Sequence, residues 1–213
     1  FEECFAYSVV TAGQNAPTIG SWDMDNAINL KGMFENVTWT SLGIGAWNFV
    51  VAQDFRRMFS GAANYNEDLN NWGSFGSTTA TVTNMKGMFK DAASFNSDLN
   101  RWNVSNVTDM DNMFNGATDF NGNITRGTFS GWLPSSCTTM SGMLDGAASF
   151  DKNIGGWDVS NVANMSDMFT GASSFSTTNY DLLLEGWSTQ TLQNAVDLGV
   201  GTTQYSSGAP ATA

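Results

Sequence analysis

The chain has 213 residues, of which 41% are hydrophobic and 13% aromatic, so it can form a core and is not a disordered polar chain. Eight basic residues against twenty acidic ones give a net charge of -12, and histidine is absent. Without a cluster of Lys or Arg, so acidic a chain is poorly suited to bind nucleic acid or an anionic membrane. No stretch approaches the eighteen apolar residues of a membrane-spanning helix, so we expect no direct membrane insertion by this segment.

A short repeat runs through the whole sequence. Its marker is a Met followed by Phe or Leu, and successive markers follow one another at steps of 25 or 30. Counting back from the first marker places a degenerate copy at Ser8 and Val9, so we predict about seven 25-residue units, some with five-residue insertions. The marker methionines, which we expect in the structural core, are Met33, Met58, Met88, Met113, Met143 and Met168.

Six tryptophans recur with nearly the same spacing as these markers. Five of them lie 11 positions before the next marker, namely Trp22, Trp47, Trp102, Trp132 and Trp157. Trp72 lies 16 before its marker because "GSFGSTTAT" contains five extra residues. Further insertions of this size fall in "NGNITRGTFSG" and "STTNYDLLLEG". Repetition at one slot favours core packing over a cofactor site. We therefore expect one core column, made of Trp22, Trp47, Trp72, Trp102, Trp132 and Trp157.

The residues between these anchors predict the fold class. They are rich in Asn, Asp, Ser, Thr and Gly, which disfavour a helix. The spacing near three instead favours a repeat solenoid, in which short parallel strands pair between successive coils about 4.8 Å apart. One unit buries too little apolar surface to fold alone, so neighbouring units must supply the rest of the core. We predict a single solenoid over residues 1–187.

The C-terminal residues change character. Leu192, Val196, Leu198 and Val200 include a period-two run suited to a last strand, and a tail rich in Gly and Thr follows. An open stack exposes unpaired backbone on its last coil. We therefore predict a capping segment and tail over residues 188–213.

Two stretches, "FNSDLNRWNVSNVTDMDNMFNGA" and "FDKNIGGWDVSNVANMSDMFTGA", resemble the repeat of the BspA-like leucine-rich-repeat surface proteins of bacteria and mycoplasmas. The resemblance covers nearly the whole chain. It implies a leucine-rich-repeat-like right-handed coil that is exported or surface-exposed and works by adhesion or protein contact. It brings no catalytic residues with it.

The two cysteines and the repeated asparagines favour structural roles. Cys4 and Cys137 occupy different slots five coils apart, too far for a disulfide, and Cys137 takes a buried valine slot. Asparagines recur in two slots, and we expect their side chains to bond neighbouring coils as a ladder. These slots hold Asn66, Asn96, Asn121 and Asp151, and Asn26, Asn106 and Asn161. Calcium is a weaker alternative, because the spacing fits no known calcium loop, and we expect no metal and no cofactor.

Function follows less directly from the residues. No nucleophile, phosphate-binding or paired-carboxylate motif is present, so we expect no enzyme. The first hypothesis is a module for adhesion or protein contact at a cell surface, with a protein or glycan partner and a binding surface that includes Thr108, Asp109, Asp111 and Asn112. The second is a structural component of an extracellular assembly, such as a virion fibre, a decoration protein or a filament, whose partners are neighbouring subunits. Both place the chain outside the cell, on a cell surface or on a virion. Ice binding is a weak third idea, because the threonines of the first insertion do not recur in register.

Overall fold

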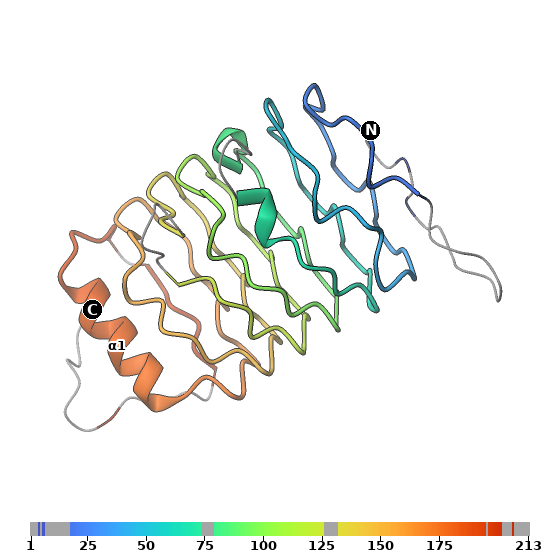
Figure 1. Ribbon diagram of the computed structural model, residues 1–213. Coiled ribbons are helices and arrows are strands. Elements are labelled where there is room, and N and C mark those ends of the chain that lie inside the picture. The colour runs from blue at the N-terminus through green and yellow to red at the C-terminus, as the bar shows by residue number, and fades with distance from the viewer. Residues whose placement is uncertain are drawn as a thin grey trace.

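The computed structural model describes Cys4, Ala6, residues 18–73, 79–125, 132–194 and 196–201, and Ser206. The chain forms a row of windings that lie side by side, with the N-terminus at one end and a helix, α1, at the other (Figure 1). Helical elements are the 3-10 turns η1 (Asn70–Gly73) and η2 (Thr79–Thr81) and the helix α1 (Thr177–Ser188). The unit predicted at Ser8 and Val9 and much of the first two insertions lie outside the described residues.

Six turn segments hold the windings together. In the first, the backbone N–H groups of Leu30, Gly32 and Phe34 donate to carbonyl groups of the next winding, each at 2.9 Å. The N–H groups between them bond within their own winding, as Met33 does to the Leu30 carbonyl at 3.1 Å. The pattern recurs from winding to winding. The turn segments are residues 29–36, 54–61, 84–91, 109–116, 139–146 and 164–171.

These segments correct the predicted fold class. The predicted repeat solenoid, a leucine-rich-repeat-like coil with short parallel strands, is wrong, because among the described residues β-pairing between windings is limited to isolated parallel bridges, such as Asn84 to Asp109. Each turn segment contains two residues with positive φ, for example Gly87 at 60° and Asp91 at 57°. Such residues reverse the direction of the backbone, so an extended strand cannot form. The predicted last strand is likewise reduced to one bridge, between Met165 and Leu198.

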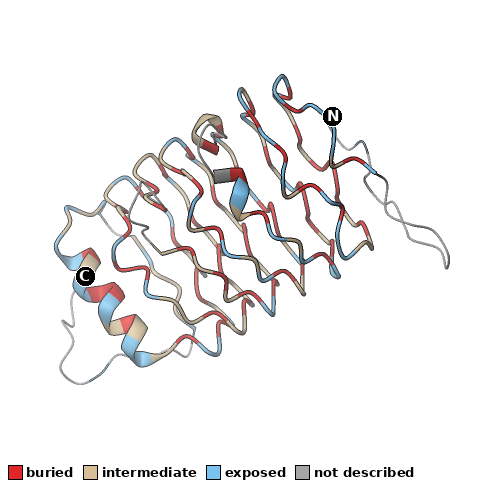
Figure 2. Ribbon diagram, in the orientation of Figure 1, coloured by how far each residue is buried: buried red, intermediate tan, exposed pale blue. Residues whose placement is uncertain are grey.

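Columns of aromatic rings fill the space between the two sides of each winding. Phe59, Phe89 and Phe114 stack at centroid distances of 5.4 and 5.6 Å, with interplanar angles of 2° and 3°. Trp72 stacks on Trp102 at 5.8 Å. Buried residues run along the inside of every described winding (Figure 2). The core is therefore continuous along the row.

Each buried tryptophan also bonds the preceding winding. The indole Nε1 of Trp102 donates to the Leu69 carbonyl at 2.9 Å, and that of Trp132 to the Leu99 carbonyl at 2.7 Å. A buried indole N–H usually has such an acceptor, because an unpaired buried donor costs free energy. The same bond is made by Trp47, Trp72, Trp157 and Trp187.

The helix α1 completes the last winding, where the sequence predicted only an insertion. Its N-cap Ser176 accepts a hydrogen bond from the N–H of Asn179. Its buried face includes Tyr180 and Trp187, and the Trp187 indole bonds the preceding winding. Gly186 allows this close packing, because a Cβ there would lie 2.0 Å from the Gly155 carbonyl oxygen. The predicted boundary at residue 187 falls in the last turn of α1.

Candidate functional site

One row of asparagines ties together the windings on the side of the molecule that carries a shallow pocket. The Oδ1 of Asn66 accepts from the N–H of Asn96 at 3.0 Å, and the Oδ1 of Asn96 accepts from the N–H of Asn121 at 2.7 Å. Asn121 bonds Asp151 in the same way at 3.0 Å, and Asp151 bonds Ser176 at 3.0 Å. This confirms the predicted ladder. Each amide uses its oxygen on the next winding, which leaves its Nδ2 group to face outward.

A second row, two positions further on, presents carboxylates. The Oδ1 of Asp68 accepts from the N–H of Asn70 at 2.9 Å and from the Ser97 hydroxyl at 3.4 Å. The Oδ1 of Asp98 accepts from the N–H of Asn123 at 2.7 Å. Both aspartates are exposed. One oxygen of each carboxylate thus accepts a backbone N–H, that of Asn70 for Asp68 and that of Asn123 for Asp98.

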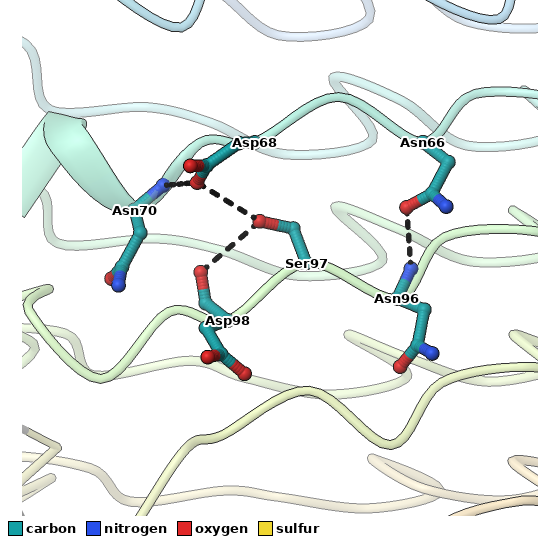
Figure 3. Close-up of a pocket in the computed structure, with 6 residues that line it drawn as sticks. All are labelled: Asn66, Asp68, Asn70, Asn96, Ser97 and Asp98. Carbon is teal, nitrogen blue, oxygen red and sulfur yellow. Dashed lines mark hydrogen bonds between the residues drawn. The ribbon is translucent and has the colours of Figure 1, made fainter.

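These two rows form a shallow groove of about 390 Å³, lined by Asn66, Asp68, Asn70, Asn96, Ser97 and Asp98 (Figure 3). Within the described part of the chain, no hydrogen bond engages the Nδ2 groups of Asn66 and Asn96 or the Oδ2 atoms of Asp68 and Asp98. A row of donors therefore lies beside a row of acceptors. Such a surface can hydrogen-bond hydroxyl or amide groups of a polar ligand.

Among the residues that the structure describes, no group of three or more His, Cys, Asp or Glu side chains lies close enough to hold a metal ion. The described ranges also contain no helix that is long and apolar enough to cross a membrane.

A family model described as "Mycoplasma protein of unknown function, DUF285" matches residues 3–126 and 125–207. The chain belongs to this family. Neither the curated proteins nor the solved structures give a match. The DUF285 model matches twice in succession. The groove residues, between Asn66 and Asp98, lie within the first of the two matched stretches.

The binding surface predicted for this DUF285 chain lies at the start of the fourth turn segment, residues 109–116, and on Thr108 just before it. Thr108 is exposed, and its hydroxyl donates to the Thr83 carbonyl at 3.1 Å. Asp109 forms bridges to both neighbouring windings. Asp111 accepts from the N–H of Ser141 at 2.9 Å and pairs with Lys86 at 3.2 Å. The structure brings these residues together, but it uses many of their polar atoms to join windings.

Asn112, the fourth residue of that predicted surface, has a left-handed backbone with φ of 55°. Asparagine tolerates this conformation better than most residues. Gly142 lies beside it, since a Cβ there would be 2.8 Å from the Asn112 Oδ1. Asn112 therefore has a conformational role in its turn segment.

One of the residues predicted to lie in the core is not buried. Trp22 is 37% exposed. The other predicted core residues are buried, namely Trp47, Trp72, Trp102, Trp132, Trp157, Met33, Met58, Met88, Met113, Met143 and Met168. Sequence reasoning missed Trp187, although it follows Trp157 at the same interval at which Trp132 follows Trp102.

The cysteines and the second asparagine slot also have defined places. Cys4 is exposed and Cys137 is buried, and both are free thiols, as predicted. Burial raises the pKa of the Cys137 thiol to about 12. The Nδ2 groups of Asn106 and Asn161 donate to carbonyls of the preceding winding, those of Ala80 at 2.7 Å and Ser135 at 2.8 Å.

A short threonine row also escaped the sequence analysis. The hydroxyls of Thr83, Thr108 and Thr138 each donate to the carbonyl of the preceding winding, at 3.3, 3.1 and 3.0 Å. These threonines recur at the same steps as the Met markers. The signal was therefore present in the sequence, because Thr83, which the prediction grouped with the threonines of the first insertion, recurs in register as Thr108 and Thr138.

Proposed function

We propose that this chain is a non-enzymatic, surface-exposed protein that mediates adhesion or protein contact, as the BspA-like surface proteins do. In this proposal the groove between Asn66 and Asp98 binds a protein or glycan on another surface. The chain then acts outside the cell, at a cell or virion surface. It needs no cofactor, and its net charge of -12 disfavours nucleic acid as a partner.

The paired rows of donors and acceptors are the observation that carries this proposal. A ligand that lies along the row meets the same groups on two successive windings, since Asn96 repeats Asn66 and Asp98 repeats Asp68. Repetition of weak contacts gives a useful total affinity without a deep pocket. An extended glycan or polypeptide has hydroxyl or amide groups at regular intervals and so fits this surface.

The test is binding of the purified chain to panels of immobilised glycans and surface proteins, compared with a double variant, Asn66→Asp with Asn96→Asp. This change keeps the Oδ1 acceptor that holds the next winding, as Asp151 does naturally in the same row. It converts two outward donors into acceptors. Each lost contact is worth about 1 kcal/mol, so we expect at least a tenfold loss of affinity.

A matched control is Asn103→Asp with Asn164→Asp, which makes the same chemical change outside the groove. Both residues use Oδ1 to accept a nearby backbone N–H, and aspartate occurs naturally in the same slots, at Asp158 and at Asp109, so the control should fold and bind as the original chain does. Equal binding by the groove variant and the control would contradict the role of the groove. The absence of any partner on the panels would contradict the adhesive function itself.

A structural role in an extracellular assembly is the second candidate. It is favoured by one specific observation, that the first three turn segments are basic and the last three are acidic.

A further inference from the structure

The turn segments divide into a basic half and an acidic half. The first three, residues 29–36, 54–61 and 84–91, contain five basic and three acidic residues. The last three, residues 109–116, 139–146 and 164–171, contain four acidic residues and no basic one. The sign of the charge therefore changes at the middle of the six described windings.

The charges lie in register along the row. The bridges align one residue of each turn segment, from Asn29 to Asn164, so the residues two positions later form a parallel row. In chain order this row reads Lys31, Arg56, Lys86, Asp111, Ser141 and Ser166. A single stripe thus begins with long cationic side chains and ends with short anionic or neutral ones.

The cations are available to a partner. The side chains of Arg56, Arg57, Lys86 and Lys90 are between 42 and 51% exposed. They already pair with carboxylates of their own chain, as Arg57 does with Glu35 and Lys86 with Asp111 at 3.2 Å. The carboxylates of these two pairs are only 5 and 17% exposed, whereas the cations are about half exposed. A second carboxylate can therefore approach the exposed cation while the pair within the chain stays in place.

We propose that the turn segments form the interface of a two-fold symmetric dimer, in which two copies of this chain lie antiparallel. A two-fold axis between the third and fourth windings places the basic half of each copy on the acidic half of the other. Lys86 then faces Asp111 of the second copy. Arg56 faces the winding of Ser141, where small residues leave room for its long side chain.

Other partners match less of the surface. A linear polyanion would be attracted to Arg56 and Lys86 and repelled by Asp111, Asp145 and Asp167, so it would cover half of the row. A parallel arrangement of two copies would place like charges together, which costs free energy. The antiparallel dimer is the arrangement in which both halves meet the opposite charge. It is independent of the adhesive function, because the groove residues lie outside the turn segments.

The experiment is sedimentation equilibrium of the full 22.9 kDa chain at about 10–100 μM in buffer of about 0.15 M and about 1 M ionic strength. We expect a dimer at the lower ionic strength and dissociation at the higher one, because salt screens the ion pairs. A monomer at both ionic strengths would overturn the proposal.

Two charge-reversed single variants then test the arrangement. Lys86→Glu and Asp111→Lys should each weaken self-association at least tenfold, because each copy then faces a like charge at both symmetry-related contacts. An equimolar mixture should restore the dimer, since every contact in the mixed pair joins opposite charges. Folding of each variant is checked by near-ultraviolet circular dichroism.

The control is Arg101→Glu with Lys152→Glu, which lowers the net charge at positions outside the turn segments. It should dimerise as the original chain does. Failure of the mixture to dimerise, or equal weakening by the control, would overturn the antiparallel dimer. If a single variant fails to fold, the salt dependence of the original chain and the control still decide.

Discussion

Replacing Trp102 by Phe tests how strongly a buried indole joins two windings. The Trp102 side chain is fully buried, its Nε1 lies 2.9 Å from the Leu69 carbonyl oxygen, and its ring stacks on Trp72. Phenylalanine keeps an aromatic ring in the column but has no donor. The variant therefore removes one bond between windings and leaves a small void.

The magnitude follows from these two losses. Phenylalanine has three fewer heavy atoms, and a void of roughly 40 Å³ at about 24 cal/mol per Å³ costs about 1 kcal/mol. The lost hydrogen bond costs about 1 kcal/mol more. The Leu69 carbonyl keeps the N–H of Trp72 at 3.1 Å, so it is not left without a donor. We expect Trp102→Phe to lower the free energy of unfolding by about 2 kcal/mol.

The assay is urea denaturation followed by circular dichroism, with Trp22→Phe as the matched control. Trp22 occupies the same slot but is 37% exposed, so its replacement should cost less than about 1 kcal/mol. Equal m-values are needed for the two free energies to be compared. An equal cost at both positions would refute the claim that buried indoles join the windings.

Three further outcomes follow from single side chains. Burial raises the pKa of the Cys137 thiol to about 12. We therefore expect a thiol reagent at about pH 8 to modify only Cys4 in the folded chain and both cysteines in denaturant. Rapid labelling of both cysteines without denaturant would contradict this. Burial opposes ionisation of Asp151, but hydrogen bonds from Ser176 and Asn179 outweigh it and lower the pKa of this carboxyl. The resulting stabilisation is present above the unfolded pKa of about 4 and is lost as the pH falls through the lower folded value, so Asp151→Asn should reduce the drop in melting temperature between about pH 7 and pH 3, and an unchanged drop would count against it. Finally, Asn96→Ala removes the acceptor for the Asn121 N–H and should cost about 1 kcal/mol of unfolding free energy, whereas Asn96→Asp should cost less, and the reverse order in a urea titration would argue against the ladder.

The repeat could be predicted from the sequence because inward slots tolerate few residue types. Met88 and Phe89 recur one unit later as Met113 and Phe114, and this regularity established the unit and the order of the windings. The same reasoning missed α1, although a capping Ser176 precedes apolar residues at helical spacing. The reading of that stretch as an insertion of constant size concealed the helical pattern.

The local conformation of the turn segments could not be predicted from apolar spacing. Gly87 and Asp91 are residue types that adopt positive φ readily, but Arg57, with φ of 54°, gives no such signal. The hydrogen bonds to the next winding impose that conformation. The groove was missed for a related reason, because which side-chain polar atom of Asn66 or Asp68 stays without an internal partner depends on how two distant segments align.

The most direct test of the account removes one complete unit. Deleting residues 84–108 joins Thr83 to Asp109, which occupies the same bridge position as Asn84. The shortened chain should keep its columns in register and unfold cooperatively, with a near-ultraviolet circular dichroism signal like that of the original. Deleting residues 84–96, about half a unit, should abolish that signal. Loss of the signal in the first deletion, or its retention in both, would contradict the claim that successive windings hold one another in register.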